Sequence, residues 1–321
     1  MITNFVYRQD KLLQNISRQD LAKTLWEKDS FIWVDLEDPT EFETEILIEL
    51  FNFHPLSIED CINDHSEPKI DEYDEYLFMV VHAIDVGSSA ELKTKELNVF
   101  INKNYVVTFH KNPIASVAEV RNLVEKKAGG PMSEGLDMLV HAILDRLVDK
   151  YLPVITEQDR RLDEIEDTIF KGAGEQVLQQ ILDIQKGVLY LKRIIGPQRD
   201  KMAQLSRSAW TFVRPQNLAY YRDIYDHLFK YYQMAEELNG LLNGILQVYF
   251  SHVSYQLNKA IKTMTVIATV SIPSVAIASV YGMNFKYIPH LEWKYGFHFS
   301  IGLMIAISAI LMIWMKIKKW Y

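Results

Sequence analysis

The stretch TMTVIATVSIPSVAIASV at Thr263–Val280, followed by YGMNF at Tyr281–Phe285, decides the architecture of this 321-residue chain. The run is apolar with interspersed hydroxyl residues, and a second apolar run without Asp, Glu, Lys or Arg follows at Phe297–Met315. At 1.5 Å per residue, each run is about long enough as a helix to cross a bilayer core of roughly 30 Å. The connection between them is rich in aromatic residues, which suit a membrane interface. The chain is therefore expected to end in a transmembrane helical hairpin.

Basic residues flank this hairpin on one side. Lys259 and Lys262 precede the first run, and Lys316, Lys318 and Lys319 follow the second. By the positive-inside tendency both termini are cytosolic, and the start of the sequence shows no secretory signal that would carry the polar part outward. The net charge of -8 then belongs to cytosolic segments. We expect an integral protein of the cell (inner) membrane.

The remainder of the chain divides into two regions, so that the predicted class is α+β. Residues 1–130 mix short strand and helix patterns, which is typical of a cytosolic α/β domain. Residues 131–260 change to a helical periodicity and form a predicted stalk, and residues 261–321 form the hairpin with its outer loop and basic C-terminus. Within the first region we expect strands at 31–36, 76–84, 97–101 and 105–109, the last two joined as a hairpin, and helices at 41–52, 55–63 and 114–127.

The stalk is predicted to contain an antiparallel helix pair. Ser133 can cap a helix that reaches Phe170, Gly172–Gly174 can turn the chain, and a second helix would occupy Glu175–Ala209. A further helix runs from Gln216 into the first membrane run and would be on the order of 100 Å long. Its apolar residues suit packing against copies of itself in a bundle. Such a helix could transmit a change in the cytosolic domain to the membrane.

Two spans of one chain cannot enclose an aqueous path, so a channel needs several copies. No Asp or Glu lies in either span, so few ligands could replace the water of a divalent ion, which should cross largely hydrated. Oxygens at Gly282, Met283 and Asn284 would then bind its water shell, and Ile261 and Ile272 would form a gate that closes by drying. Ordinary packing within the membrane is the alternative role for this helix face. The helical period of about 100° predicts that one face lines the pore, with Asn258, Ile261, Thr265, Ala268, Ile272, Val275 and Ser279. Met264 is a further pore-lining candidate.

The Tyr-Gly-Met-Asn-Phe sequence after a first membrane helix, with a second helix close behind and a basic end, resembles the CorA family of magnesium and cobalt transporters. The resemblance implies a homopentameric funnel with one pore on the fivefold axis and a ring of Gly-Met-Asn loops as the selectivity entrance. It implies passive transport, in agreement with the absence of a Gly-x4-Gly-Lys-Ser/Thr loop from the sequence. Further segments similar to the family extend over most of the chain: His54–Asp60, Arg222–His227, Asn258–Thr265, Ile272-Pro273 and Trp293–Gly296.

The resemblance also implies regulatory magnesium bound by carboxylates between cytosolic subunits. Asp223, facing Asp74 or Glu75 of a neighbouring copy, supplies the candidates in this sequence. Facing carboxylates repel one another, a cation bridges them, and its loss frees the subunits to separate. Lys150 occupies a position that is acidic in relatives, which argues against a second regulatory site there. At the pore, Ile261 and Ile272 stand where some relatives have Met, and Val275 replaces a hydroxyl residue.

Two other functions compete with a magnesium channel. A zinc transporter could share this architecture, although Met283 argues against it. A membrane-tethered enzyme or signalling scaffold would need chemistry in the α/β domain, but His54, His82, His110 and His141 are scattered and no His-Glu-x-x-His, Cys-x-x-Cys or Gly-x-Ser-x-Gly motif occurs. We therefore expect no enzyme and no organic cofactor. The expected cargo is chiefly magnesium, with cobalt and nickel as further candidates, and the expected partners are other copies and the bilayer, not nucleic acid.

Overall fold

The computed structural model describes residues 1–27, 30–63, 67–85, 92–172, 174–207, 210–286, 288, 293–318 and 320. The chain forms two compact units, one comprising Met1–Asp167 and Gln176–Gly244, the other Thr168–Glu175 and Ile245–Tyr321. Of the residues that entered the sequence predictions, Ala173 in the expected turn, Ala209 at the expected helix end and Lys319 in the basic C-terminus lie outside the described residues.

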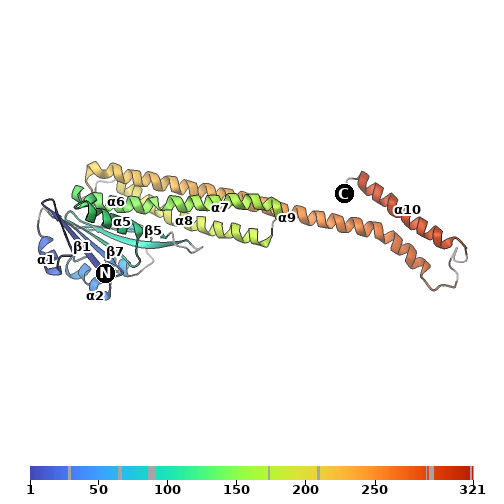
Figure 1. The fold of residues 1–321 in the computed structure, drawn as a ribbon, viewed down its shortest axis with the longest axis horizontal. Coiled ribbons are helices and arrows are strands. Elements are labelled where there is room, and N and C mark those ends of the chain that lie inside the picture. Colours follow the sequence, from blue (N-terminus) through green and yellow to red (C-terminus); the bar gives the residue numbers. More distant parts are fainter. Residues whose placement is uncertain are drawn as a thin grey trace. The chain divides into compact units, whose positions relative to one another are not determined.

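A seven-stranded mixed sheet organises the N-terminal part of the first unit (Figure 1). Its strand order is β2-β1-β3-β7-β6-β5-β4, with β3 and β7 parallel and the other neighbouring pairs antiparallel. One long-range parallel pairing therefore joins two antiparallel groups. The strands are β1 Ile2–Arg8, β2 Lys11–Gln14, β3 Phe31–Glu37, β4 Lys69–Glu72, β5 Leu77–Asp85, β6 Lys93–Ile101 and β7 Tyr105–His110.

The predicted hairpin around Asn102 is confirmed. Ile101 pairs with Val106 across the turn, and the Asn104 N–H donates to Asn102 Oδ1 at 3.3 Å. The central strands β3 and β5 were also predicted, because long runs of apolar residues mark strands buried on both faces. The sequence analysis missed β1, β2 and β4. Two of these, β2 and β4, are four-residue edge strands whose short polar sequences carry little pattern.

Helices cover both faces of the sheet. Apolar residues of α1 Arg18–Thr24, α3 Ile46–Glu49 and α4 Pro55–Ile62 pack into one core cluster with β3, β5 and β7. On the opposite face lie α5 Ala115–Lys126 and α6 Leu136–Asp149 (Figure 1). The predicted helix at 41–52 is wrong as a single element. It is divided into α2 Glu41–Thr44 and α3. At the division, the Ile48 N–H donates to the carbonyl of Glu45, three residues earlier, as in a 3-10 turn.

The predicted helix start at Ser133 is also wrong. Ser133 lies in a 3-10 turn, η1 Gly130–Glu134, where its hydroxyl donates to the Gly130 carbonyl at 2.7 Å. The helix begins at Leu136, directly after Gly135. Gly135 has a φ of 128°, a backbone conformation that would be strained in a residue with a side chain. Asp137 then anchors the new start, because its carboxylate accepts hydrogen bonds from Arg214 and Asn217.

The stalk helices are α7 Tyr151–Gly172, α8 Glu175–Arg207 and α9 Leu218–Tyr281, the last preceded by a turn, η2 Pro215–Asn217. Within the first unit, α8 and α9 are joined by an ion pair between Lys192 and Glu236 and by apolar residues buried at helical spacing. The 64 residues of α9 confirm the prediction of one helix that continues into the first membrane run. This helix therefore belongs to both units.

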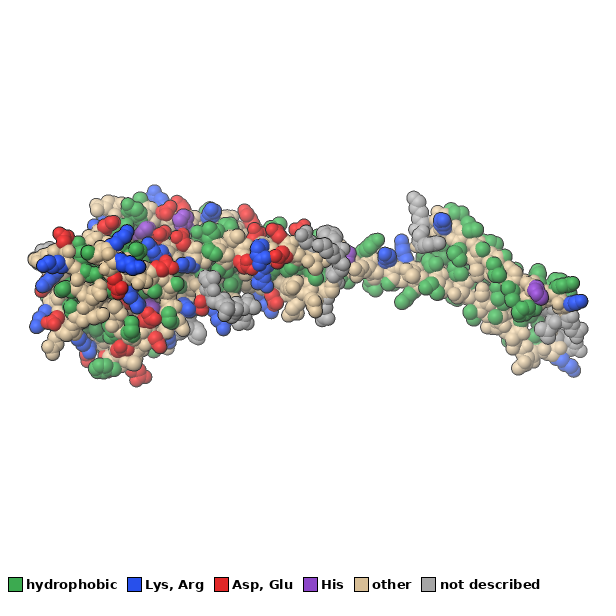
Figure 2. All heavy atoms as spheres, viewed as in Figure 1, with side chains coloured by type: hydrophobic (Ala, Val, Ile, Leu, Met, Phe, Trp, Pro, Cys, Tyr) green, Lys and Arg blue, Asp and Glu red, His purple; other side chains and the backbone are tan. Residues whose placement is uncertain are grey.

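Among the residues that the structure describes, two helices are long and apolar enough to cross a membrane, α9 through its C-terminal part and α10 Gly296–Ile317, and both of these apolar parts lie in the second unit. Their most apolar 18-residue windows have mean hydropathies of 1.8 and 2.1 and at most two charged residues. Hydrophobic side chains dominate their visible surface, whereas the first unit carries mixed acidic and basic side chains (Figure 2). These properties fit the predicted transmembrane hairpin.

Candidate ion pathway

One face of α9 is occupied by α10. The Ser308 hydroxyl of α10 lies 3.2 Å from the Ser274 hydroxyl and donates to the Val270 carbonyl at 3.2 Å. This contact is placed beside Pro273, which has no N–H and interrupts the hydrogen bonding of α9. The Ser308 hydroxyl thus gives the Val270 carbonyl a hydrogen bond that lipid could not supply. The half-buried α9 residues near it, including Ile277, mark the face turned toward α10.

The predicted pore stripe lies largely outside this contact. The exposed fractions of Ile261, Ile272 and Val275 are 52%, 64% and 62%. Such large apolar side chains are normally covered, either by lipid or by another protein surface. The stripe is thus available to copies of the chain or to a water path. Of the eight predicted pore-lining residues, Asn258, Ile261, Met264, Ala268, Ile272, Val275 and Ser279 are exposed, and Thr265 is half-buried.

The stripe carries few polar groups, and one of them already makes a hydrogen bond within α9. The Thr265 hydroxyl donates to the Ile261 carbonyl at 2.8 Å, one turn earlier. Its oxygen retains acceptor capacity and can still accept a hydrogen bond from water. Asn258 adds an exposed amide at the N-terminal end of the stripe. This surface can contact a hydrated ion but lacks the ligands to strip one of its water.

The Gly-Met-Asn triplet lies where α9 ends. The Gly282 N–H donates to the Ala278 carbonyl at 2.9 Å, and the Met283 N–H donates to the Val280 carbonyl at 3.3 Å. A Cβ at Gly282 would lie 3.2 Å from the Ala278 oxygen, so the absence of a side chain relieves a close approach to the helix end. Met283 is 48% exposed and Asn284 is also exposed. The side chain of Asn284 is therefore accessible to solvent at the end of the helix.

The three predicted regulatory carboxylates are exposed in the single chain. Asp74 and Glu75 occupy the turn between β4 and β5, and Asp223 lies on α9. Among the described residues, neither group of three metal-type ligands includes any of them. Within the described part of one chain, these three side chains therefore do not form such a group.

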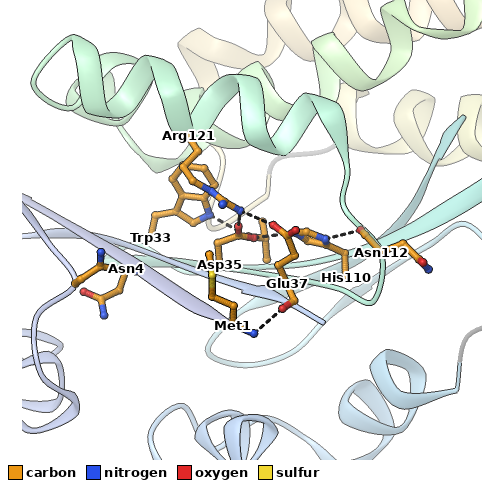
Figure 3. A network of polar contacts seen from close by, with 10 residues as sticks. Met1, Asn4, Trp33, Asp35, Glu37, His110, Asn112 and Arg121 are labelled. Carbon is orange, nitrogen blue, oxygen red and sulfur yellow. Dashed lines mark hydrogen bonds and ion pairs between the residues drawn. The ribbon is translucent and has the colours of Figure 1, made fainter. Parts of the chain in front are cut away.

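The sequence analysis missed a buried polar network at the end of β3 (Figure 3). Asp35 accepts hydrogen bonds from the Thr108 hydroxyl at 2.6 Å and from His110 Nε2 at 3.1 Å. His110 Nδ1 lies 2.8 Å from the Asn112 carbonyl, so both ring nitrogens have a hydrogen-bond partner. Arg121 of α5 forms ion pairs with Asp35 and, at 2.9 Å, with Glu37.

The charge of Arg121 determines whether this network could bind a metal ion. Burial alone would raise the pKa of Asp35, but hydrogen bonds from His110 and Thr108 and the charges of His110 and Arg121 outweigh burial and lower it. Although Asp35, Glu37 and His110 have the spacing of metal ligands, the guanidinium already supplies the positive charge. The network therefore ties β3, β7 and α5 together and is no candidate for holding an ion.

Comparisons with known proteins agree on one family for this chain. A family model described as "CorA-like Mg2+ transporter protein" matches residues 28–318. YfjQ of Bacillus subtilis is 34% identical over 317 residues, covering 98% of this chain and 96% of that protein. The cobalt/magnesium transport protein CorA of Thermotoga maritima is 30% identical over 273 residues, covering 85% of this chain and 78% of that protein. These similarities confirm the resemblance predicted from the sequence motifs.

A solved structure extends the comparison to the fold. The CorA magnesium transporter from Methanocaldococcus jannaschii matches with a TM-score of 0.87 at 21% identity, covering 100% of this chain and 99% of that one. Its likeness confirms the predicted combination of an N-terminal α/β domain, a long stalk helix and a C-terminal apolar helix.

Proposed function

Because this chain belongs to the CorA-like Mg2+ transporter family, we propose that it forms a passive membrane channel for divalent cations, chiefly magnesium. The observation that carries this proposal is the exposed Gly282-Met283-Asn284 loop at the end of an apolar helix whose open face has no carboxylate. Amide and carbonyl oxygens there suit the water shell of an ion that gives up its waters reluctantly. Cobalt and nickel are the other cargo candidates.

Five copies would enclose the path, each contributing the stripe of α9. Ile261 and Ile272 would form rings that exclude water when the pore narrows and admit hydrated ions when it widens. A potential of 100 mV contributes about 2.3 kcal/mol per elementary charge, or about 4.6 kcal/mol for a divalent ion. With both termini cytosolic, such a potential would drive inward transport without a nucleotide.

Regulation would act through the cytosolic domain. Magnesium bound by Asp223 and by Asp74 or Glu75 of a neighbouring copy would hold subunits together and keep the pore narrow. The support is electrostatic, because exposed carboxylates brought face to face repel one another unless a cation bridges them. Loss of the ion would let the stalk helices tilt, and α9 would carry that movement to the gate.

The test is divalent-cation flux into proteoliposomes that contain the purified chain without nucleotide. Asn284→Ala should lower magnesium flux by at least about ten-fold, because it removes a polar group worth roughly 1.4 kcal/mol or more to the passing ion. Asn243→Ala, which removes an exposed amide from the cytosolic part of the same helix, is the matched control and should retain flux.

Three results would contradict the proposal. Equal flux through the parent and Asn284→Ala would remove this residue from the filter. No flux of magnesium, cobalt, nickel or zinc, at low and at high internal magnesium, would favour the scaffold function instead. A clear preference for zinc over magnesium would favour the zinc transporter of the same architecture.

A further inference from the structure

An open groove of about 560 Å³ lies in the second unit, between α9 and the segment that follows α10. The wall formed by α9 includes Lys259, Lys262, Val266 and Ile267, and Trp320 forms the opposite wall. All of these residues stand at the end of the hairpin where α9 enters its apolar run and α10 has ended. The groove is therefore a feature of the membrane hairpin at the border of its apolar part.

The wall after α10 is fixed by the way that helix ends. The Trp320 N–H donates to the Met315 carbonyl at 3.0 Å, and the Lys318 N–H donates to the Trp314 carbonyl at 3.0 Å. Met315 is only 2% exposed, so this end of α10 is packed. An indole ring has an apolar body and one N–H donor, which suits the layer between water and hydrocarbon. Trp320 is thus held as an interfacial side chain beside α9.

The groove lies on the side of α9 that faces α10, away from the predicted pore stripe. At about 100° per residue, Val266 lies roughly 140° around the helix from Ile261. Val266 also comes one turn before Val270, whose carbonyl accepts the hydrogen bond from Ser308. Asn258, at the N-terminal end of the groove, is the residue that it shares with the stripe. A ligand in the groove would therefore lie outside the predicted pore.

The two lysines of the groove have no counter-ion in the described part of the chain. Neither Lys259 nor Lys262 forms an ion pair there, and both side chains are exposed. Over residues 245–321 the sequence contains a single acidic side chain, Glu292, which belongs to the connection between the two membrane helices. The N-terminal end of the groove thus carries an uncompensated positive charge.

The groove changes from cationic to apolar along its length. From Lys259 to Ile267 the helix rises by about 12 Å. The headgroup layer on each side of a hydrocarbon core is roughly 5–8 Å deep, so the groove is long enough to pass from headgroups into hydrocarbon. Ile267 is 61% exposed and Val266 is half-buried, so both can contact an acyl chain. A free phosphate ion would use only the cationic end.

We propose that this groove binds an anionic phospholipid, with the phosphate at Lys259 and Lys262 and an acyl chain along Val266 and Ile267. Ammonium groups bind phosphate oxygens as compact positive charges. The order of charge and apolar surface along the groove matches the order of headgroup and acyl chain in a phospholipid. The proposal needs the membrane hairpin but not the proposed channel function.

Lipid binding to the purified full-length chain in detergent, counted by native mass spectrometry, tests this groove. The probes are phosphatidylglycerol and phosphatidylcholine with identical acyl chains. Phosphatidylglycerol should bind about thirty-fold more tightly, because each lysine near an anionic headgroup contributes about a factor of five. Lys259→Gln with Lys262→Gln should remove this preference, whereas Lys259→Arg with Lys262→Arg should keep it. The matched control, Lys286→Gln with Lys294→Gln, removes two exposed lysines near the other end of the hairpin and should bind both lipids as the parent does.

Three results would overturn the proposal. Equal affinity of the parent for the two lipids would indicate that another copy of the chain, or an acidic segment of it, covers the groove instead. Displacement of phosphatidylglycerol by an equal concentration of inorganic phosphate would indicate a site for free anions. Equal loss of the preference in the Lys286 and Lys294 control would assign it to the overall charge of the hairpin.

The test still decides if the double glutamine variant does not assemble. Lys259→Gln and Lys262→Gln each remove one exposed charge, and each alone should lower the preference about five-fold. Unchanged preference in both single variants would also contradict the proposal. Failure of the channel proposal is separable, because Asn284→Ala should keep the preference for phosphatidylglycerol whether or not the parent conducts magnesium.

Discussion

At the scale of single residues, the buried charge of Asp35 illustrates how tertiary contacts set chemistry. Its side chain is fully buried and depends on His110, Thr108 and Arg121, which lie 73 to 86 positions away in the sequence. No local pattern connects these residues. The sequence analysis considered His110 as a scattered histidine, and the structure instead gives it a fixed role between Asp35 and the Asn112 carbonyl.

Arg121→Met should destabilise the chain by about 3–5 kcal/mol, because it leaves a buried carboxylate without its counter-ion. The measurement is the unfolding of parent and variant in the same detergent. Arg121→Lys is the control, and it should recover part of the loss because it restores the positive charge but not the planar guanidinium that reaches both Asp35 and Glu37.

The stability lost in Arg121→Met should also depend on pH. The folded pKa of Asp35 lies below its ordinary value of 3.8, so its contribution is complete above that value and disappears as the pH falls through the lower folded value. Without Arg121 the folded pKa rises. The stability difference between parent and variant should therefore be largest near neutral pH and shrink below about pH 4. A difference that stays constant to pH 3 would contradict the assigned role of the ion pair.

At the scale of elements, one face of α9 contacts α10 and another face remains exposed. Ser308 of α10 contacts Val270 and Ser274 beside the proline, while Ile261 and Ile272 remain exposed on the predicted pore stripe. The period of 3.6 residues predicted which residues share the stripe, but it could not distinguish the face that α10 would cover. That choice depends on contacts between helices.

The double substitution Ile261→Ser and Ile272→Ser should increase magnesium flux at inhibitory internal magnesium by about ten-fold, which corresponds to about 1.4 kcal/mol removed from the barrier. Hydroxyl groups at these positions would hold water in a gate that otherwise closes by drying. Proteoliposome flux measures the effect. Ile267→Ser, which places a hydroxyl at an exposed position outside the stripe, should behave as the parent, and leakage through this control would assign the effect to general loosening of the helix.

At the scale of the whole molecule, self-association is expected from apolar residues that one chain leaves uncovered. Leu241, Val248 and Tyr255 on α9 are 56%, 42% and 65% exposed and follow one another at intervals of seven residues. This spacing places them along one side of the helix, as in contacts between parallel helices of different chains. Burial of these three side chains between copies of the chain would favour assembly before any metal binds.

Leu241→Glu together with Val248→Glu should shift the assembly toward smaller species and abolish flux, because charges replace the apolar contact. Native mass spectrometry of the purified chain should give five copies for the parent. The control, Asn243→Asp with Gln247→Glu, adds the same charge at exposed polar positions of α9 and should keep five. A parent that remains monomeric at all concentrations would contradict the pentamer.

The sequence by itself determined the membrane hairpin, the long α9 helix, the central strands and the Gly-Met-Asn loop, because each depends on local hydrophobic runs or on periodicity along one element. It also predicted the residues of the pore stripe, whose role as a pore remains a proposal. The tertiary structure alone decided the helix start at Leu136, the Asp35 and Arg121 network and the grouping of Asp145, Asp149 and His227. These features join side chains from separate elements, and their charge balance depends on which cation folding brings within reach. Such long-range pairing leaves no periodic signal in the chain.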